Sequence, residues 1–189
     1  MVNPLPHEFY NHSTLIVARE LLGTRLVRIL DGVRLIGLIT EAEAYIGEED
    51  LGCHAKSGKT KRNAVMYGPP GYAYIYFTYG MHWMLNAVTE QIGFPAAVLI
   101  RAIDPVEGAD IISVRRQERD TLGPAKLTQA LGIDGALNGI DLCNPDSGLW
   151  IEAGTPVADE DILTSPRVGL FTVPEPWKSL PWRFRMRRR

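Results

Sequence analysis

The sequence contains little cysteine and no long apolar run. Its 189 residues include 2 cysteines, Cys53 and Cys143, which are far apart in sequence and too few for a disulfide framework. No Cys-x-x-Cys or His-x-x-x-His spacing occurs, so the spacing of residues indicates no metal site. No apolar stretch approaches the roughly 20 residues that cross a bilayer, and residues 1–23 lack the layout of a secretory signal. We therefore expect a reduced, cytoplasmic protein without a membrane partner.

Positive charge is absent from one long stretch of the chain. Residues 127–166 contain seven acids and no lysine or arginine, whereas the whole chain has 20 basic and 22 acidic residues and a formal net charge of -2. Outside that stretch, 20 bases stand against 15 acids. The bases form three clusters: Lys56, Lys59, Lys61 and Arg62; Arg115, Arg116 and Arg119; and Arg183, Arg185, Arg187, Arg188 and Arg189. This distribution predicts a basic face opposite an acidic one and leaves a polyanionic partner open.

Apolar patterning and turn residues predict an α+β fold in a single domain, residues 1–189, with a mainly antiparallel curved sheet and peripheral helices. We predict strands over residues 24–30, 33–45, 72–79, 81–88 and 95–103, and helices over 13–22, over 108–117 and from 123 onward. Asp31-Gly32 is a strong hairpin signal. Residues 56–71 are predicted to form a loop. Residues 132–173 are predicted to hold short strands and turns, and a basic tail follows.

Two carboxylates lie on an otherwise apolar predicted strand. Side chains alternate between the faces of a strand, so Glu41, Glu43 and Tyr45 are expected to point the same way. Such carboxylates can face water or pair with arginine, but a strand-borne carboxylate with a raised pKa is also a good general base for activating water. Residues i and i+2 of one strand lie about 7 Å apart with parallel side chains, which is not the flanking geometry of a two-carboxylate sugar hydrolase.

An aromatic strand follows the predicted loop. Tyr72, Tyr74 and Tyr76 alternate on one face, and Tyr79-Gly80 falls at the turn that ends the strand. A tyrosine row is typical of cross-strand packing, but three phenols on one face each need a hydrogen-bond partner if buried. The functional alternative is a pocket that stacks a planar base, with Tyr79 turned outward as a wedge.

Two further polar residues have both a structural and a functional interpretation. His54 follows an acidic loop and the adjacent Cys53, but neighbouring side chains in an extended chain point apart, so the pair is a weak signal for a Cys/His catalyst. Lys126, at the start of a predicted helix, either contacts a phosphate or is simply solvated.

A set of motifs in fixed order resembles one known family. The motifs are Glu41-Ala42-Glu43-Ala44-Tyr45, His54, Arg62-Asn63, residues 66–71 and 74–82, Asn86, Arg101-Ala102, residues 123–127, Arg167-Val168-Gly169 and Pro181-Trp182-Arg183-Phe184. Together they look like the alkyladenine (3-methyladenine) DNA glycosylase family, of the α+β rather than the helix-hairpin-helix type. The resemblance covers nearly the whole chain, which makes it far more specific than any single motif.

The resemblance implies a base-excision DNA repair enzyme. Members flip alkylated or deaminated purines, of the 3-methyladenine, hypoxanthine and ethenoadenine class, out of duplex DNA and hydrolyse the N-glycosidic bond, which leaves an abasic site. It implies a monofunctional glycosylase without lyase activity, without a metal or other cofactor and without an obligate protein partner. The expected location is the bacterial cytoplasm, with activity at the nucleoid.

The resemblance also assigns the catalytic residues. Glu43 matches the general base that activates water for attack at C1′, and Arg101 matches the arginine that places that water and carboxylate. Glu41 matches no catalytic residue. Lys126 lies in the family's Gly-Pro-x-Lys-Leu helix start, near the DNA backbone. Cys53 departs from the pattern, which has a small residue before this histidine, and we expect Cys53 to pack.

A second group of matches implies a pocket for the flipped base. Tyr45, His54 and Tyr76 match residues that sandwich the base, and Asn86 matches the residue that crowds the exocyclic amine of guanine. Tyr79 matches the side chain that inserts into the duplex. An N-alkylated purine is cationic, so tyrosine faces favour it by roughly 0.5–2 kcal/mol depending on desolvation.

Two alternatives to a DNA glycosylase remain at this stage. The basic clusters and tyrosines would also suit a nucleic-acid-binding module without catalysis, and the carboxylates would suit a glycosidase of nucleosides or sugars. The glycosylase requires Glu43 for turnover, whereas the binding module does not. A glycosidase of small substrates has no need of the basic tail.

Overall fold

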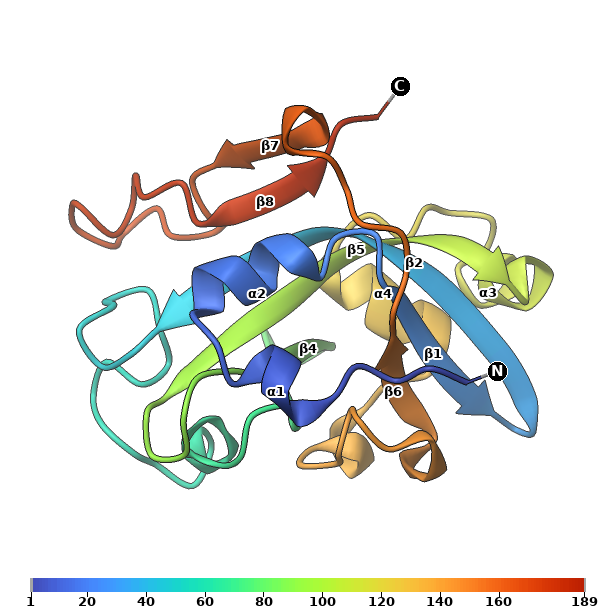
Figure 1. Ribbon diagram of the computed structural model, residues 1–189, viewed down its shortest axis with the longest axis horizontal. Helices are drawn as coiled ribbons and strands as arrows, with labels where there is room; N and C mark the ends of the chain where they lie inside the picture. Colours follow the sequence, from blue (N-terminus) through green and yellow to red (C-terminus); the bar gives the residue numbers. More distant parts are fainter. Residues whose placement is uncertain (1, 189) are drawn as a thin grey trace.

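The fold is α+β and is built on one antiparallel sheet, as predicted. The structure, a computed structural model, describes residues 2–188. The strands are β1 (Arg25–Leu30), β2 (Val33–Ile46), β3 (Ala73–Thr78), β4 (His82–Val88), β5 (Ala96–Glu107), β6 (Leu149–Glu152), β7 (Ile162–Ser165) and β8 (Arg183–Met186). Their order is β3-β4-β5-β2-β1-β6, with β8 between β2 and β7. Figure 1 shows the long β2 and β5 crossing the molecule as a curved ribbon.

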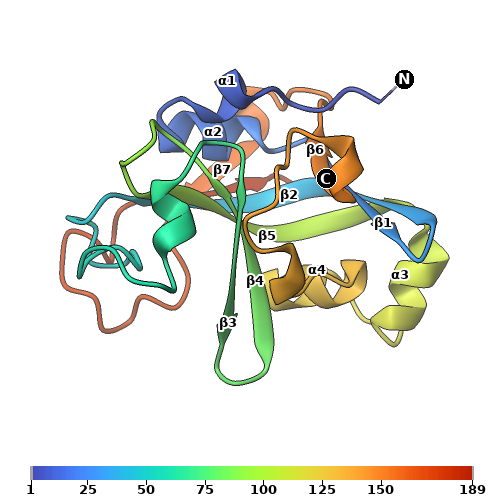
Figure 2. The same ribbon diagram turned by 90° about the horizontal axis from the view of Figure 1, so that it is seen from below.

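Helices pack on both sides of this sheet. They are α1 (His7–Tyr10), α2 (Thr14–Glu20), α3 (Ala109–Arg115) and α4 (Pro124–Leu131), with short 3-10 turns at Ala64–Tyr67, Gly135–Leu137, Pro145–Ser147 and Asp159–Asp161. Figure 2 shows α1 and α2 on one side and α3 and α4 on the other. Buried apolar side chains of α2, α4 and the strands form one core, which includes Val17, Ile100 and Leu127. Burial of these apolar surfaces is the main force that holds the helices on the sheet.

The middle of β2 is irregular where the chemistry is expected. The register of β2 against β5 shifts on both sides of Glu41, so β-bulges flank this residue. The other edge of the same segment pairs with β8, with Glu41 opposite Arg185 and Glu43 opposite Arg183. Bulges bend a strand and re-aim its side chains. Here they occur where two strands from distant parts of the chain meet β2.

The β3–β4 hairpin projects from the rest of the molecule. Its tip contains Tyr79 and Gly80, whose φ angles of 53° and 67° lie in the left-handed region. Such angles are common in tight hairpin turns, and glycine adopts them at no steric cost. Figure 2 shows the hairpin running alongside α4 and its tip extending beyond the rest of the molecule. The tip therefore presents Tyr79 outward, with 82% of its surface exposed.

Most predicted elements are present, with three differences. Tyr72 makes an isolated bridge to Asp141 before β3 begins, so it does not continue the tyrosine row. Strand β5 continues to Glu107, beyond its predicted end. The basic tail contains β8, which the sequence analysis did not predict and which pairs with β2 and β7. Across residues 2–188, no helix has the length and hydropathy needed to span a bilayer.

The predicted separation of an acidic face from a basic one is wrong for the C-terminal arginines. Strand β7 lies in the acidic stretch and pairs directly with β8. The backbone N–H of Arg187 donates to the carbonyl of Asp161, and the side chain of Arg188 pairs with Asp104 at 3.0 Å. Strand β7 itself carries no charged residue, but the acidic turn Asp159–Asp161 directly precedes it, so the acidic stretch and the basic tail lie side by side.

Candidate active site

Glu43 is a buried carboxylate held by three donors. Its side chain has no exposed surface. The backbone N–H of Val168 donates to Oε1 at 2.7 Å, while the Tyr45 hydroxyl and the Arg101 guanidinium donate to Oε2 at 2.9 and 3.2 Å. Burial raises the pKa of Glu43, although the Arg101 charge and the bonds from Val168 and Tyr45 oppose the rise. A carboxylate with a raised pKa accepts a proton from water more readily than an ordinary one.

Arg101 joins the two carboxylates of β2, which confirms that they share a face. Its Nε donates to Glu41 at 2.6 Å and its Nη1 to Glu43 at 3.2 Å. Glu41 also accepts a bond from Arg183 of β8 at 2.8 Å. Burial raises the pKa of Glu41, but the bonds from Arg183 and Arg101 outweigh it and lower the pKa below its usual value. Glu41 thus remains an anion that orients Arg101, and the arginine pairing considered for these carboxylates is what the structure shows for Glu41.

Aromatic and polar side chains surround a cavity of about 320 Å³ beside this carboxylate. The predicted pocket residues Tyr45, His54, Tyr76 and Asn86 all line it, together with Arg101, Tyr74, Tyr79 and Val168. Three of these lining residues, Tyr45, Arg101 and Val168, are the ones that donate hydrogen bonds to Glu43. The structure therefore brings the predicted base-binding residues and the predicted general base to one place.

His54 packs edge-on against the tyrosines. Its ring lies 4.4 Å from that of Tyr76, and its Nδ1 is 2.9 Å from the Tyr74 hydroxyl. Partial burial, together with the charges of Arg62 and Lys56, lowers the pKa of His54 to about 4. The imidazole is therefore neutral at physiological pH, so the aromatic wall of the cavity does not repel a cationic ligand.

Asn86 and Lys126 have defined partners within the protein. The Asn86 amide donates to the Tyr74 carbonyl at 2.9 Å, which fixes the side chain at the cavity wall. The Lys126 ammonium lies 2.8 Å from Asp120 in an exposed ion pair, and its contact with a phosphate stays a prediction. Cys53 is buried in the small core under the cavity, as expected for a packing residue.

One basic cluster lies beside the cavity. Lys56, Lys59, Lys61 and Arg62 are all exposed, and Arg62 lies 5.3 Å above the Tyr76 ring. By contrast, Arg115 donates to carbonyls of α4 and Arg116 to the Asp120 carbonyl. Two arginines of the second cluster are therefore engaged within the protein, whereas the first cluster is exposed next to the tyrosines.

A buried ion pair under Tyr45 was not predicted. Arg167 and Asp50 have no exposed side-chain surface, and the guanidinium binds both carboxylate oxygens, at 2.5 and 2.8 Å. The same guanidinium lies 4.7 Å from the Tyr45 ring and donates to the Ala44 carbonyl. Because Val168 follows Arg167, this pair also places the backbone N–H that binds Glu43. The two residues are 117 positions apart, and only the fold brings them together.

Comparison with known proteins agrees with this site. Residues 8–189 match the family described as methylpurine-DNA glycosylase (MPG). The chain belongs to this family. Curated relatives include proteins named "Putative 3-methyladenine DNA glycosylase" from Carboxydothermus hydrogenoformans, 54% identical over 95% of this chain and 93% of the relative, and from Methanocella arvoryzae, 48% identical over 95% and 90%. A third, from Myxococcus xanthus, is 45% identical over 98% and 91%.

Membership of the methylpurine-DNA glycosylase family indicates the class of reaction that this site catalyses. The family acts on DNA and hydrolyses N-glycosyl bonds, so the predicted DNA glycosylase is supported at this level. The resemblance inferred from the ordered motifs is confirmed. The roles of individual residues remain predictions, and the contacts above determine how each can be tested.

We predict that Asp50→Asn lowers the free energy of unfolding by about 3–5 kcal/mol, because it leaves the buried Arg167 charge without a carboxylate. Equilibrium urea denaturation measures the change. The matched control is Asp104→Asn, which removes an ion pair whose side chains are 51% and 58% exposed. This control is expected to change stability by only about 0–1 kcal/mol, and equal losses in the two variants would contradict the structural role of Asp50.

We also predict that His54 titrates near pH 4, well below an ordinary histidine at about 6.5. Because the folded-state pKa is lowered, the unfolded chain binds the proton first, and stability falls as the pH drops from about 6.5 towards 4. Proton NMR of the imidazole measures the pKa. Arg62→Gln removes a nearby positive charge and is expected to raise it, and an unchanged value in that variant would contradict the assigned cause.

Proposed function

We propose that this protein excises alkylated and deaminated purines from duplex DNA by hydrolysis of the N-glycosidic bond. The observation that supports the proposal most is the buried Glu43, held by Val168, Tyr45 and Arg101 at the wall of a tyrosine-lined cavity. A purine in the cavity would lie against aromatic faces with its sugar beside this carboxylate. Damaged bases reach such a pocket by rotating out of the duplex.

The proposed reaction needs a general base that takes a proton from water, but it does not need a strong acid. Glu43 accepts a proton from a water molecule bound beside Arg101, and the water oxygen bonds to C1′ of the sugar. The electrons of the breaking N-glycosidic bond pass to the purine. An N-alkylated purine already carries a positive charge, so it leaves as a neutral base without a strong acid. The products are a free base and an abasic site.

The nucleophile distinguishes a monofunctional glycosylase from a lyase. Lyase activity at an abasic site requires an amine that forms a Schiff base with the sugar. Among the described residues that line the cavity, none is a lysine. This composition supports water as the nucleophile and supports the absence of strand cleavage.

The pocket walls support discrimination among bases. Cationic purines gain about 0.5–2 kcal/mol from tyrosine faces, and the neutral His54 adds no repulsion. Neutral lesions such as hypoxanthine and ethenoadenine gain less from these faces. The fixed Asn86 amide provides the wall against which the exocyclic amine of guanine is crowded.

The projecting hairpin supports a role for Tyr79 in flipping. Its ring is largely exposed at the tip of the hairpin and also borders the cavity. Insertion of such a side chain fills the space that the flipped nucleotide leaves. The exposed cluster from Lys56 to Arg62 would hold the backbone phosphates nearby. Lys126 contributes to phosphate binding only if it exchanges Asp120 for DNA.

We predict that Glu43→Gln slows single-turnover release of 3-methyladenine by about 100- to 10,000-fold, the usual contribution of a general base. Binding of the damaged duplex is expected to persist, because the amide keeps the size of the carboxyl. In the wild type, excision falls as acid protonates Glu43. Since burial raises its pKa, this acid limb lies above the ordinary glutamate value of about 4.3.

The control for this variant is Glu48→Gln, at an exposed residue whose carboxylate binds the Tyr67 hydroxyl. It is expected to retain the wild-type rate. A wild-type rate in Glu43→Gln would overturn the mechanism and favour a binding module without catalysis. Release of base from free nucleosides at the rate seen on duplex DNA would favour the small-substrate glycosidase.

We predict that Tyr79→Ala weakens binding of the flipped state by about 1–3 kcal/mol, roughly 5- to 150-fold, because the inserted ring no longer stacks in the duplex. Fluorescence of a base analogue beside the lesion measures flipping. Tyr79→Phe keeps the ring and is the matched control, with near wild-type flipping expected. Unchanged flipping and excision in Tyr79→Ala would remove the wedge assignment.

A further inference from the structure

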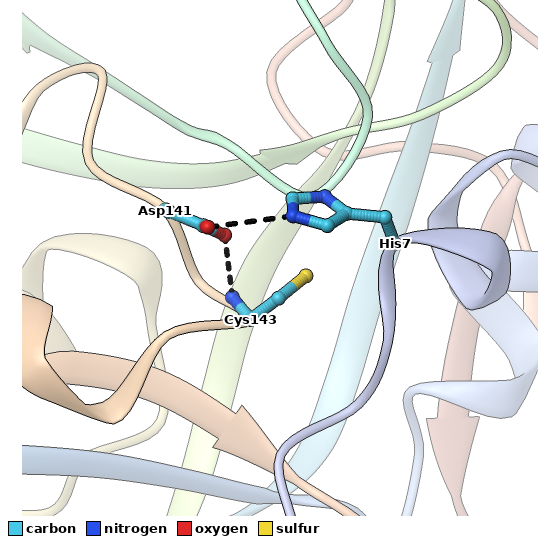
Figure 3. Close-up of side chains that lie close together, drawn as sticks. All are labelled: His7, Asp141 and Cys143. Atoms are coloured by element: carbon cyan, nitrogen blue, oxygen red, sulfur yellow. Dashed lines mark hydrogen bonds and ion pairs between the residues drawn. The ribbon is translucent and has the colours of Figure 1, made fainter.

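Three potential metal ligands converge on the side of the protein that carries α1. They are His7 of α1 and, on the segment that precedes β6, Asp141 and Cys143. One nitrogen of His7, one oxygen of Asp141 and the sulfur of Cys143 all lie within 4.8 Å of one another. Figure 3 shows the imidazole facing the carboxylate and the sulfur pointing towards the imidazole. None of the three residues lines the candidate active-site cavity.

The orientation of His7 leaves one nitrogen available as a ligand. Its Nδ1 lies 2.9 Å from the Pro70 carbonyl. A carbonyl only accepts, so Nδ1 carries the hydrogen of this bond and Nε2 holds the lone pair in the neutral ring. A backbone carbonyl that binds the second imidazole nitrogen is the usual support of a metal-ligating histidine.

Nε2 of His7 faces a second acceptor. It lies 3.3 Å from Oδ2 of Asp141, so either a second proton or a metal cation must join the two atoms. Two ligands about 2.0–2.1 Å from a tetrahedral zinc ion lie about 3.3 Å apart. The observed separation of 3.3 Å therefore matches the spacing that the metal requires, and the Cys143 sulfur lies within 4.8 Å of both ligand atoms.

The surroundings support these three residues in place. The Cys143 backbone N–H donates to Oδ1 of Asp141 at 2.8 Å, which leaves Oδ2 for another partner. Gly71 lies against the cluster: a Cβ there would meet the Cys143 sulfur at 2.8 Å and His7 Nδ1 at 3.0 Å. Only a residue without a side chain leaves both ligands in their positions.

A buried tyrosine packs against the glycine that borders the same cluster. Tyr10 is fully buried, and its hydroxyl has no hydrogen-bond partner among the described residues. Its ring also contacts the position of Gly71, where a Cβ would lie 3.1 Å from Cδ2. Tyr10, His7 and Cys143 therefore pack around the same glycine.

We propose that His7, Asp141 and Cys143 form a site for a zinc-class divalent cation, with a water molecule as the fourth ligand. A nitrogen, oxygen and sulfur donor set in tetrahedral geometry suits zinc better than magnesium or calcium, which prefer oxygen ligands. Binding replaces the thiol proton of Cys143, which passes to solvent, and the thiolate and carboxylate neutralise the ion. The site joins α1 to a segment more than 130 residues away in the sequence and acts as a structural link.

Cobalt binding to untagged, chelator-treated protein tests this proposal. We expect one cobalt ion per chain and a near-ultraviolet thiolate-to-cobalt absorption band that zinc abolishes by competition. Cys143→Ser is expected to lose the band, and His7→Gln, at a half-exposed side chain, to weaken cobalt binding at least about tenfold. The matched control is Cys53→Ala, which removes the other cysteine and is expected to keep the band and the affinity.

Thermal unfolding gives an independent measurement. Zinc is expected to raise the Tm of the wild type with the logarithm of its concentration, as for any ligand of the folded state, and to raise that of His7→Gln less at the same zinc concentration. Absence of cobalt binding, a band that survives Cys143→Ser, or an affinity independent of His7 would overturn the site and leave a His7–Asp141 ion pair. Excision by His7→Gln is expected to equal that of the wild type, so the test is separate from the glycosylase proposal.

Discussion

A carboxylate without solvent contact, that of Glu43, is the constraint on which the surrounding structure depends. Removing a carboxylate from water is costly unless other groups replace the lost hydrogen bonds. Glu43 receives those bonds from β5, from its own strand and from the loop that precedes β8. The carboxylate is thus satisfied while its pKa stays raised. The same contacts that make burial tolerable hold the carboxylate in one orientation, as the proposed proton abstraction from water requires.

Two series of contacts between charged residues hold the donors to Glu43 in position. In the first, Glu41 fixes Arg101 and is itself bound by Arg183, so the C-terminal strand contributes to the position of the active-site arginine. In the second, Asp50 fixes Arg167, which stacks on Tyr45 and precedes Val168. Each of the two series positions a group that donates a hydrogen bond to Glu43. Residues distant from the cavity can therefore alter the chemistry by shifting a donor by a fraction of an ångström.

Sequence reasoning found the parts of this site that follow from local patterns. Strand alternation placed Glu41, Glu43 and Tyr45 on one face, and the Tyr79-Gly80 turn predicted an outward aromatic ring. The Asp50–Arg167 pair, the β2–β8 pairing and the His7–Asp141–Cys143 cluster depend on contacts between residues far apart in the chain, which spacing alone cannot indicate. The expected separation of charges failed for the same reason, because β7 and β8 bring acidic and basic segments together.

The charge around the cavity depends on the residues that surround it rather than on the net charge of the whole chain. The basic residues from Lys56 to Arg62 are exposed beside the cavity, where positive charge suits a polyanion. Burial is the main cause of the lowered pKa of His54, and the charges of Arg62 and Lys56 lower it further, so this cluster also favours a neutral pocket wall. A protonated imidazole would oppose a cationic purine at the step where tyrosine stacking favours it. In the proposed function this cluster would therefore contribute both to DNA binding and to base selection, although the chain as a whole carries a net charge of -2.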